Sequence, residues 1–224
     1  MMNTFSLPFG KGTQTVSLDE AHVLYDLHGN PVDAVADEQE AIRQALRHPI
    51  GSAPLKDVVQ AGDTVAIIVS DITRLVHTAQ MLPVIVDELN QAGVRDEQIT
   101  VVTAQGTHRA HRPEEDVIVC GEDMVKRVKV VSHDCRDASQ LTKIGTTTHG
   151  NDVYLDSHVV QADKVILTGA VSFHPMAGFG GGRKAVLPGV ASYETIMRNH
   201  AMALTDTFGG ACNPRCETRL FEDT

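Results

Sequence analysis

The stretch Thr64-Val-Ala-Ile-Ile-Val69, followed by the polar segment Ser70-Asp-Ile-Thr-Arg74, decides the fold. The first stretch is almost continuously apolar and has the length of one strand, which is typical of strands buried on both faces of a parallel sheet. The turn Ala61-Gly-Asp63 precedes it. We therefore expect an α/β protein with a sheet strand that ends near Ser70.

The chain downstream alternates between strand-length apolar runs and helical patterns. The further expected strands are Ile99–Ala104, Val128–Ser132 and Lys164–Gly169. The expected helices are Met81–Ala92, which Gly93 would end, one opened by Arg112-Pro-Glu-Glu115, and one capped by Ser192 that reaches about Ala203. This alternation predicts a doubly wound, mostly parallel, Rossmann-like sheet, with a β-rich N-terminal entry around Gln14–Leu18 and a helix over Asp37–Arg47.

The composition excludes several classes of protein. The 224 residues carry a formal net charge of −10, which argues against a nucleic-acid partner because such binding needs a basic surface. No stretch approaches the roughly 20 apolar residues of a membrane span, and Met1–Gly12 lacks a signal-peptide pattern. Cys212 and Cys216 are close enough to hold a metal or a disulfide, but free thiols are the interpretation we prefer. We expect a cytoplasmic protein without nucleic-acid or membrane partners.

Ligands of doubly wound sheets bind beyond the carboxyl ends of the strands. Three polar loops should meet there, namely Ser70–Arg74, Gln105–Arg109 and Ala170–Lys184. All three carry side chains that can bind anions or move protons. Their convergence on one rim is the main reason to expect an active site.

The first two loops offer an acid, a guanidinium and an imidazole. Arg74 has a planar fork for a carboxylate or phosphate, and Asp71 could orient a neighbour. A solvated salt bridge at a strand end is the alternative. His108 follows Gly106 in a loop and could move protons near neutral pH. Most of the 11 histidines must be bystanders, and four have no supporting context: His111, His133, His149 and His158.

The third loop contains Ser172-Phe-His-Pro-Met-Ala-Gly-Phe-Gly-Gly-Gly-Arg-Lys184. Its glycines leave backbone N–H groups accessible to an anion such as a phosphate, and two basic residues stand at the end of the loop. The residues concerned are Gly178, Gly180, Gly181, Gly182, Arg183 and Lys184. The spacing is neither a Walker A loop nor a dinucleotide fingerprint, and a flexible turn is the alternative. Lys184 could also be a covalent attachment point, and His200 either a metal ligand or a surface helix residue.

Taken together, these motifs resemble the nickel-pincer racemases and epimerases of the lactate racemase family. The resemblance runs from Leu7-Pro-Phe-Gly-Lys-Gly12 to about Met202. It rests on four motifs: Asp71-Ile-Thr-Arg74, Gly106-Thr-His-Arg109, His174 with the glycine-rich loop to Lys184, and Asn199-His200.

The resemblance implies a cofactor, a nickel-pincer nucleotide, which is a pyridinium thioamide/thiocarboxylate mononucleotide carrying nickel. It implies that Lys184 holds this cofactor covalently through a thioamide and that His200 is the protein ligand of nickel, beside one carbon and two sulfurs of the cofactor. The Gly178–Arg183 loop would cradle the phosphate. Cofactor-synthesis proteins are implied as partners.

The resemblance also implies a reaction, the racemisation or epimerisation of lactate or another small 2-hydroxy acid by reversible hydride transfer. His108 and His174 would be the two acid/bases, one for each enantiomer. Arg74 would bind the substrate carboxylate, and Asp71 would orient a neighbour.

The chain departs from the family at two places. Leu75 stands where the family usually has proline after the Thr-Arg pair, and a second domain of comparable size is expected beyond this chain. We expect residues 1–60 to form a β-rich segment packed on the main domain, 61–206 the cofactor-binding domain, and 207–224 an atypical tail, with the family's C-terminal domain absent. Two alternatives remain: a truncated, non-catalytic nucleotide-binding fragment, and a nicotinamide-dependent dehydrogenase, although the ribose-binding fingerprint is lacking.

Overall fold

The computed structural model describes residues 1–174, 176–204, 220 and 223–224. By its internal contacts the chain divides into two compact units, Met1–Ala36 and Asp37–Thr224. In the first unit, β1 (Met2–Phe9) pairs antiparallel with β2 (Gly12–Asp19), and the short 3-10 helix η1 (Glu20–His22) follows. The strand expected over Gln14–Leu18 lies within β2 and is confirmed.

The second unit begins with helices, whereas the sequence analysis extended a β-rich segment to residue 60. α1 (Glu38–Arg47) starts after the Asp37 N-cap, whose carboxylate accepts from the Glu40 N–H at 2.9 Å, as the helical spacing predicted. α2 (Leu55–Val58) follows. The functional boundaries 61–206 and 207–224 stay predictions, and residues 205–219, with both Cys212 and Cys216, lie outside the described part.

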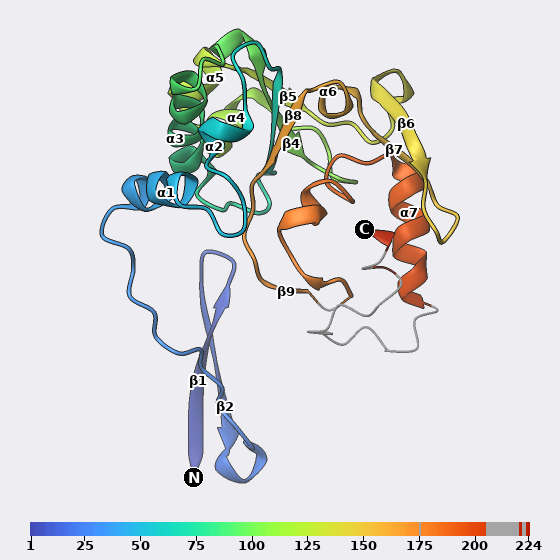
Figure 1. The fold of residues 1–224 in the computed structure, drawn as a ribbon. Coiled ribbons are helices and arrows are strands. Elements are labelled where there is room, and N and C mark those ends of the chain that lie inside the picture. Colours follow the sequence, from blue (N-terminus) through green and yellow to red (C-terminus); the bar gives the residue numbers. More distant parts are fainter. Residues whose placement is uncertain (175, 205–219, 221–222) are drawn as a thin grey trace. The chain divides into compact units, whose positions relative to one another are not determined.

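The expected parallel sheet is confirmed and has four strands in the order β5-β4-β3-β8. Figure 1 shows α3 and α5 beside this sheet. The strands are β3 (Val65–Ser70), β4 (Ile99–Ala104), β5 (Lys129–Ser132) and β8 (Lys164–Leu167). Every pair is parallel. In β3 the residues from Val65 to Val69 are all buried, which explains why that stretch is apolar without alternation.

Helices cover both faces of this sheet. Val65, Ile67 and Val69 of β3 pack into a core that includes Leu82 and Val119, residues of α3 (Thr78–Gln91) and α4 (Pro113–Cys120). α5 (Glu122–Arg127) completes this layer. Ala66 and Ile68 pack in the opposite direction, against Val159 of α6 (Ser157–Val160) and Val190. The alternation of β3 between two cores makes the sheet doubly wound.

The sequence analysis did not anticipate the hairpin between β5 and β8. β6 (Leu141–Thr146) and β7 (Asp152–Asp156) pair antiparallel. α7 (Tyr193–Ala201) packs near this hairpin, through Ile196, in a core with Leu155. The smaller elements are η2 (Asp96–Gln98), η3 (Ala138–Gln140), β9 (Phe173–His174), β10 (Gly178–Phe179), η4 (Gly182–Ala185) and η5 (Met202–Leu204).

Caps fix two of the expected helix ends. Gly93, with φ +93°, ends α3, and an added Cβ there would lie 2.8 Å from the Ala61 Cβ, so only glycine fits. Ser192 caps α7 by accepting from the Thr195 N–H at 3.2 Å. α3 begins at Thr78, before the expected Met81, and α7 ends at Ala201 rather than about Ala203.

The strand order places the polar loops at a switch point. β3 has β4 on one side and β8 on the other. The loops that follow β3 and β8 therefore begin side by side at the carboxyl edge of the sheet. In sheets of this kind a ligand crevice forms there. The fold therefore brings the Asp71–Arg74 loop next to the glycine-rich loop.

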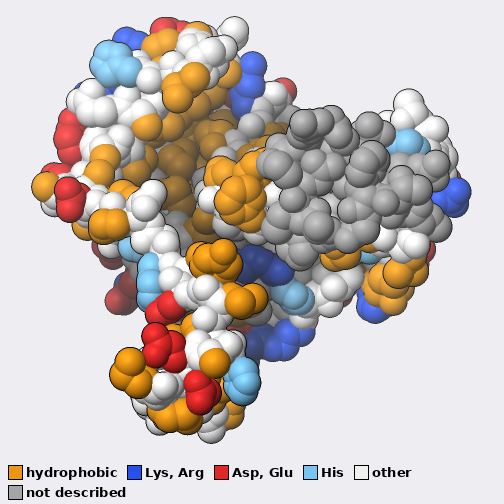
Figure 2. All heavy atoms as spheres, turned by 90° about the horizontal axis from the view of Figure 1, so that it is seen from below, with side chains coloured by type: hydrophobic (Ala, Val, Ile, Leu, Met, Phe, Trp, Pro, Cys, Tyr) orange, Lys and Arg blue, Asp and Glu red, His pale blue; other side chains and the backbone are white. Residues whose placement is uncertain are grey.

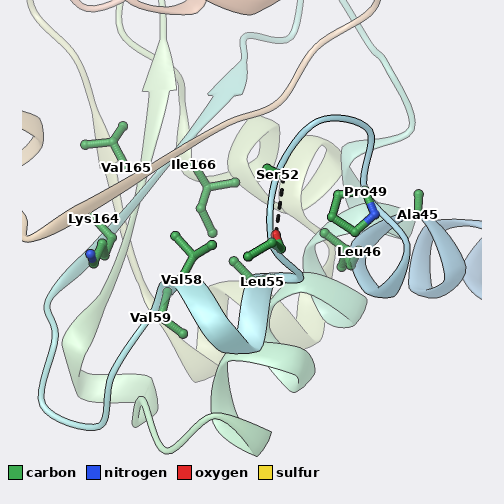
Figure 3. A pocket seen from close by; sticks show the side chains of 11 residues that line it. Ala45, Leu46, Pro49, Ser52, Leu55, Val58, Val59, Lys164, Val165 and Ile166 are labelled. Atoms are coloured by element: carbon green, nitrogen blue, oxygen red, sulfur yellow. Dashed lines mark hydrogen bonds between the residues drawn. The ribbon is translucent and has the colours of Figure 1, made fainter.

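A separate hollow lies beside β8 (Figure 3). It has a volume of about 290 Å³ and is lined by apolar side chains, among them Leu46, Leu55, Val58 and Ile166. Lys164 is its one charged lining residue. It shares no lining residue with the three polar loops. Among the described helices none is long and apolar enough to cross a membrane.

Candidate active site

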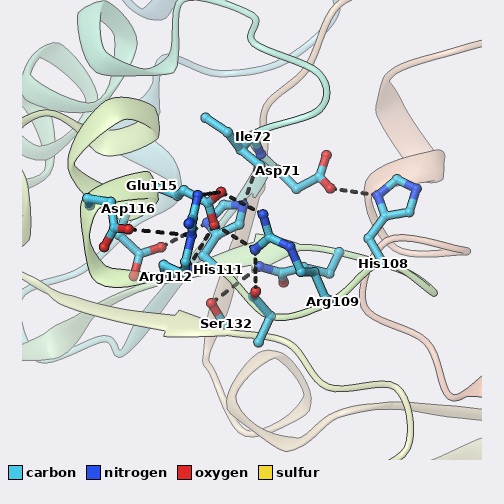
Figure 4. Close-up of polar contacts among 12 residues, drawn as sticks. Asp71, Ile72, His108, Arg109, His111, Arg112, Glu115, Asp116 and Ser132 are labelled. Atoms are coloured by element: carbon cyan, nitrogen blue, oxygen red, sulfur yellow. Dashed lines mark hydrogen bonds and ion pairs between the residues drawn. The ribbon is translucent and has the colours of Figure 1, made fainter.

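Asp71 and His108 form a short hydrogen bond between the first two loops (Figure 4). Oδ2 of Asp71 lies 2.6 Å from Nδ1 of His108, and the Thr73 hydroxyl donates to the other carboxylate oxygen at 2.7 Å. Asp71 is 2% exposed, while 40% of the His108 side chain is exposed. A carboxylate only accepts, so Nδ1 of His108 carries the proton and Nε2 is left bare as a base.

The loop that carries His108 is held against the turn that follows the third loop. The Gly106 N–H donates to the Gly189 carbonyl at 2.9 Å, and Gly106 has φ +56°. A Cβ at Gly106 would lie 3.5 Å from the Pro188 carbonyl oxygen. The left-handed backbone suits glycine, and the bond joins the second loop to the turn that follows η4.

Arg109, which follows His108, belongs to the scaffold. Its guanidinium donates to both carboxylate oxygens of Glu115, at 2.7 and 2.6 Å, and Glu115 also accepts from the Arg112 N–H at 2.8 Å. The Arg109 hydrogen bonds hold the pKa of Glu115 far below its usual range. The fork geometry fixes the second loop to the first turn of α4.

One ring nitrogen of His174 is hydrogen-bonded to the backbone of the turn that follows it. Its Nδ1 accepts from the backbone N–H groups of Met176 and Ala177, at 3.2 and 3.1 Å. Neutral His174 therefore carries its proton on Nε2, opposite to His108. Burial lowers the pKa of His174, and the charges of Lys184, His200 and Arg74 lower it further.

Lys184 is a partly buried amine in η4. Burial lowers its pKa to about 8, and the nearby Arg74 charge acts in the same direction. No carboxylate of the described residues forms an ion pair with it. An amine in this state is partly neutral near physiological pH and can act as a nucleophile.

His200 lies near the end of α7. Its Nδ1 is buried and has no hydrogen-bond partner within the described ranges. Burial lowers the pKa of the ring, with a further contribution from Lys184, while the Ile196 carbonyl acts in the opposite direction. A buried ring nitrogen without a hydrogen-bond partner is costly unless a ligand uses it.

The glycine-rich loop offers a smaller cradle than the sequence suggested. Gly178 pairs with His174 in the β9–β10 ladder, and the Gly180 N–H donates to the Ser172 carbonyl at 2.7 Å. Gly181 and Gly182 have φ +72° and +51°, and their N–H groups donate to no described residue. A Cβ at Gly181 would lie 2.8 Å from the Ala170 carbonyl oxygen. The free donors for an anion are thus at Gly181 and Gly182.

Four basic side chains from separate segments influence one another here. Arg74, His174, Lys184 and His200 are close enough for their charges to shift at least one neighbour's pKa. Basic and histidine side chains gather near the middle of the face shown in Figure 2. No ion pair in the described part of the chain neutralises these four. The unpaired charges of Arg74 and Lys184 beside two neutral imidazoles favour an anionic ligand.

These residues fit a cofactor that brings its own metal ligands. In the described ranges no group of three or more His, Cys, Asp or Glu side chains could hold a metal ion. Within these ranges, therefore, His200 does not belong to a metal site made of three or more such side chains. For such a cofactor, His200, the amine of Lys184 and the open Gly181–Gly182 backbone would be the anchors.

The sequence analysis missed two structural histidines. It set His111 and His133 aside, yet both rings are fully buried and each is hydrogen-bonded through both nitrogens. His133 bonds Asp156 and the Ala191 carbonyl at the base of α7. Asp116 and Asp156, the carboxylates that bind these rings, belong to no recognisable motif with the two histidines, so sequence spacing does not indicate either contact.

With this geometry the chain contains a doubly wound α/β domain whose polar loops meet at a sheet switch point. Residues 9–209 match the lactate racemase N-terminal domain family, and the chain belongs to that family. It is similar to lactate racemase from Lactiplantibacillus plantarum, with 36% identity over 89% of this chain and 47% of the relative. Lactate racemase from Thermoanaerobacterium thermosaccharolyticum is 31% identical over 99% of this chain and 51% of the relative.

Solved structures show the same relationship. The lactate racemase apoprotein from T. thermosaccharolyticum superposes with a TM-score of 0.85 and 28% identity, over 97% of this chain and 52% of that one. A Thermotoga maritima protein, at TM-score 0.65 and 22% identity over 88% of this chain and 47% of that one, shows the fold alone. The chain spans about half the length of the curated relatives that it matches.

Proposed function

We propose that this chain is the cofactor-holding half of a racemase or epimerase that acts on lactate or another small 2-hydroxy acid. The observation that carries the proposal is the unneutralised group of Arg74, His174, Lys184 and His200, on the same rim as the Asp71–His108 pair. Membership in the lactate racemase family supports it.

Arg74 and His108 would bind the substrate and move its hydroxyl proton. Arg74 is exposed, and the one hydrogen bond of its guanidinium among the described residues is a 3.5 Å contact to the Thr73 hydroxyl, so the guanidinium can pair with a carboxylate. Nε2 of His108 can take the hydroxyl proton. Asp71 then stabilises the resulting imidazolium, as a buried carboxylate does in other acid/base pairs.

His174 would serve the opposite side of the substrate. Racemisation must release and return the hydroxyl proton on opposite sides of a planar 2-keto acid, so two acid/base groups are needed. In the resting state His174 presents Nε2–H, while His108 presents a bare Nε2. One ring is thus ready to accept a proton and the other to donate to an oxygen, as a neutral imidazole can.

Three anchors would hold a nickel-pincer nucleotide. Lys184 would bind it covalently through a thioamide, His200 would ligate the nickel through its side chain, and Gly181, Gly182 and Arg183 would bind its phosphate. The chemistry that the bound group would supply is reversible hydride exchange with C2 of the substrate. The chain itself supplies positioning and proton transfer.

Chiral chromatography of D- and L-lactate tests the proposal. The chain is produced with cofactor-synthesis proteins and nickel, both alone and with the second half of the L. plantarum relative, and assayed in D₂O. Interconversion that keeps ¹H at C2 is expected, because hydride does not exchange with solvent. Deuterium at C2 would indicate proton abstraction and overturn the hydride mechanism. No turnover in either form would favour a non-catalytic nucleotide-binding fragment.

A further inference from the structure

His111 is a fully buried histidine whose two ring nitrogens have opposite partners (Figure 4). Its Nε2 lies 2.9 Å from the backbone nitrogen of Ile72, and its Nδ1 lies 2.9 Å from Oδ1 of Asp116. The side chain is 1% exposed. An amide N–H can only donate, so Nε2 is the acceptor and the ring proton is on Nδ1, facing the carboxylate.

The His111 ring and its two partners lie in three different segments. Ile72 directly follows Asp71 in the loop after β3, and Asp116 lies in α4. His111 itself is in the segment that carries His108. A single ring therefore joins the loop of the Asp71 carboxylate, the loop of the His108 imidazole and the helix behind both.

The other contacts of the His108 loop do not replace this connection. Arg109 ties the loop to Glu115 of α4, and Gly106 ties it to Gly189. Neither bond reaches the Asp71 loop. Apart from the Asp71–His108 bond itself, the bond from the Ile72 N–H to His111 is the hydrogen bond described between these two loops.

We propose that His111 is a positioning residue, which holds the backbone beside Asp71 against the His108 loop and so sets the 2.6 Å Asp71–His108 hydrogen bond. Its effect on turnover rests on the proposed function, because it acts through His108. Its effect on the Asp71–His108 bond does not. Being buried, the ring itself touches no substrate.

Two substitutions separate hydrogen bonding from packing. His111→Gln keeps an acceptor oxygen that can reach the Ile72 N–H, while His111→Leu fills similar space and leaves that N–H unpaired. His133→Leu is the matched control, because it removes another buried, doubly bonded histidine whose partners are Asp156 and Ala191. Urea unfolding of all three reports stability separately.

Nuclear magnetic resonance of ¹⁵N-histidine-labelled protein is the direct readout and needs neither cofactor nor activity. We expect His111 to be protonated at Nδ1, and the His108 Nδ1 proton to resonate far downfield because of its short hydrogen bond. His111→Leu should move that resonance upfield or abolish it, whereas His111→Gln and His133→Leu should retain it. A His111 proton on Nε2, or an unchanged His108 resonance in His111→Leu, would overturn the proposal.

Racemisation by the loaded protein provides the second readout. Misplacing a proton-transfer group by about 1 Å can cost on the order of 100-fold in rate, so His111→Leu should lower kcat at least about tenfold with little change in KM, and His111→Gln should restore most of it. Equal losses of kcat in both variants would count against positioning by the hydrogen bond. If the wild type shows no racemisation, the proposed function fails while the resonance experiment still decides the role of His111. If His111→Leu does not fold, the wild-type protonation state and His111→Gln decide it.

Discussion

Nδ1 of His108 lies 2.6 Å from the buried carboxylate of Asp71, and this contact sets which ring nitrogen of His108 carries the proton. Asp71→Asn can present an amide N–H to the ring, which would favour the opposite protonation state. Loss of an orienting carboxylate of this kind lowers kcat on the order of 10⁴-fold in other enzymes. We expect kcat for lactate racemisation to fall at least about 100-fold. Asp57→Asn, at an exposed position, should leave it unchanged; a loss below about tenfold in Asp71→Asn would contradict an orienting role.

His108 and His174 should differ in their resting protonation state. The Met176 and Ala177 N–H groups occupy Nδ1 of His174, while Asp71 occupies the protonated Nδ1 of His108. Ring ¹⁵N chemical shifts of the cofactor-free protein near pH 8 should therefore show His174 protonated at Nε2 and His108 at Nδ1. The same protonation state in both rings would disagree with the geometry.

Lys184 should destabilise the cofactor-free fold below pH 8. Its pKa is about 8 in the folded protein and 10.5 as the ordinary value, so the unfolded chain binds more protons between these pH values and stability rises with pH there. Lys184→Met should gain roughly 1 kcal/mol at pH 7, after discounting for partial exposure. The gain should shrink between pH 8 and 10.5 in urea unfolding. Lys126→Met, an exposed lysine, is the control; a gain independent of pH would indicate packing instead.

Gly181 and Gly182 should respond differently to alanine. Both have positive φ, which costs roughly 1–2 kcal/mol for an L-residue, but only at Gly181 would the new Cβ meet a backbone atom, 2.8 Å from the Ala170 oxygen. At Gly182 nothing lies within 4 Å. Gly181→Ala should therefore be the less stable variant in urea unfolding. Equal losses of unfolding free energy in the two variants would mean that the backbone at Ala170 can move away from the new Cβ at little cost.

The sequence predicted the layers of the fold better than the details of the site. Runs such as Val65–Val69 and caps such as Ser192 are local, and each was found where spacing placed it. The β6–β7 hairpin was missed because its residues are mostly exposed or half-buried, so no apolar pattern marks it. The rim could be predicted because the carboxyl ends of parallel strands meet.

Contacts between loops could not be predicted. That Asp71 meets His108, or that His111 meets Ile72, depends on how two turns approach across the sheet, 37 and 39 positions apart in sequence. Likewise, spacing predicted one role for every glycine of the third loop, although Gly178 and Gly180 are bonded within the chain and Gly181 and Gly182 remain open.

The mass of the Lys184 peptide tests the central claim most directly. Protein produced with cofactor-synthesis proteins and nickel is digested and its peptides are weighed, while nickel is measured on the intact chain. We expect a nucleotide-sized adduct on Lys184 with bound nickel in the wild type, no adduct in Lys184→Met, and an adduct with less nickel in His200→Ala. A lactate racemase relative produced in the same way is the positive control. If the relative is fully modified while Lys184 of this chain is not, or if Lys184→Met carries the same adduct, attachment of the cofactor at Lys184 is contradicted.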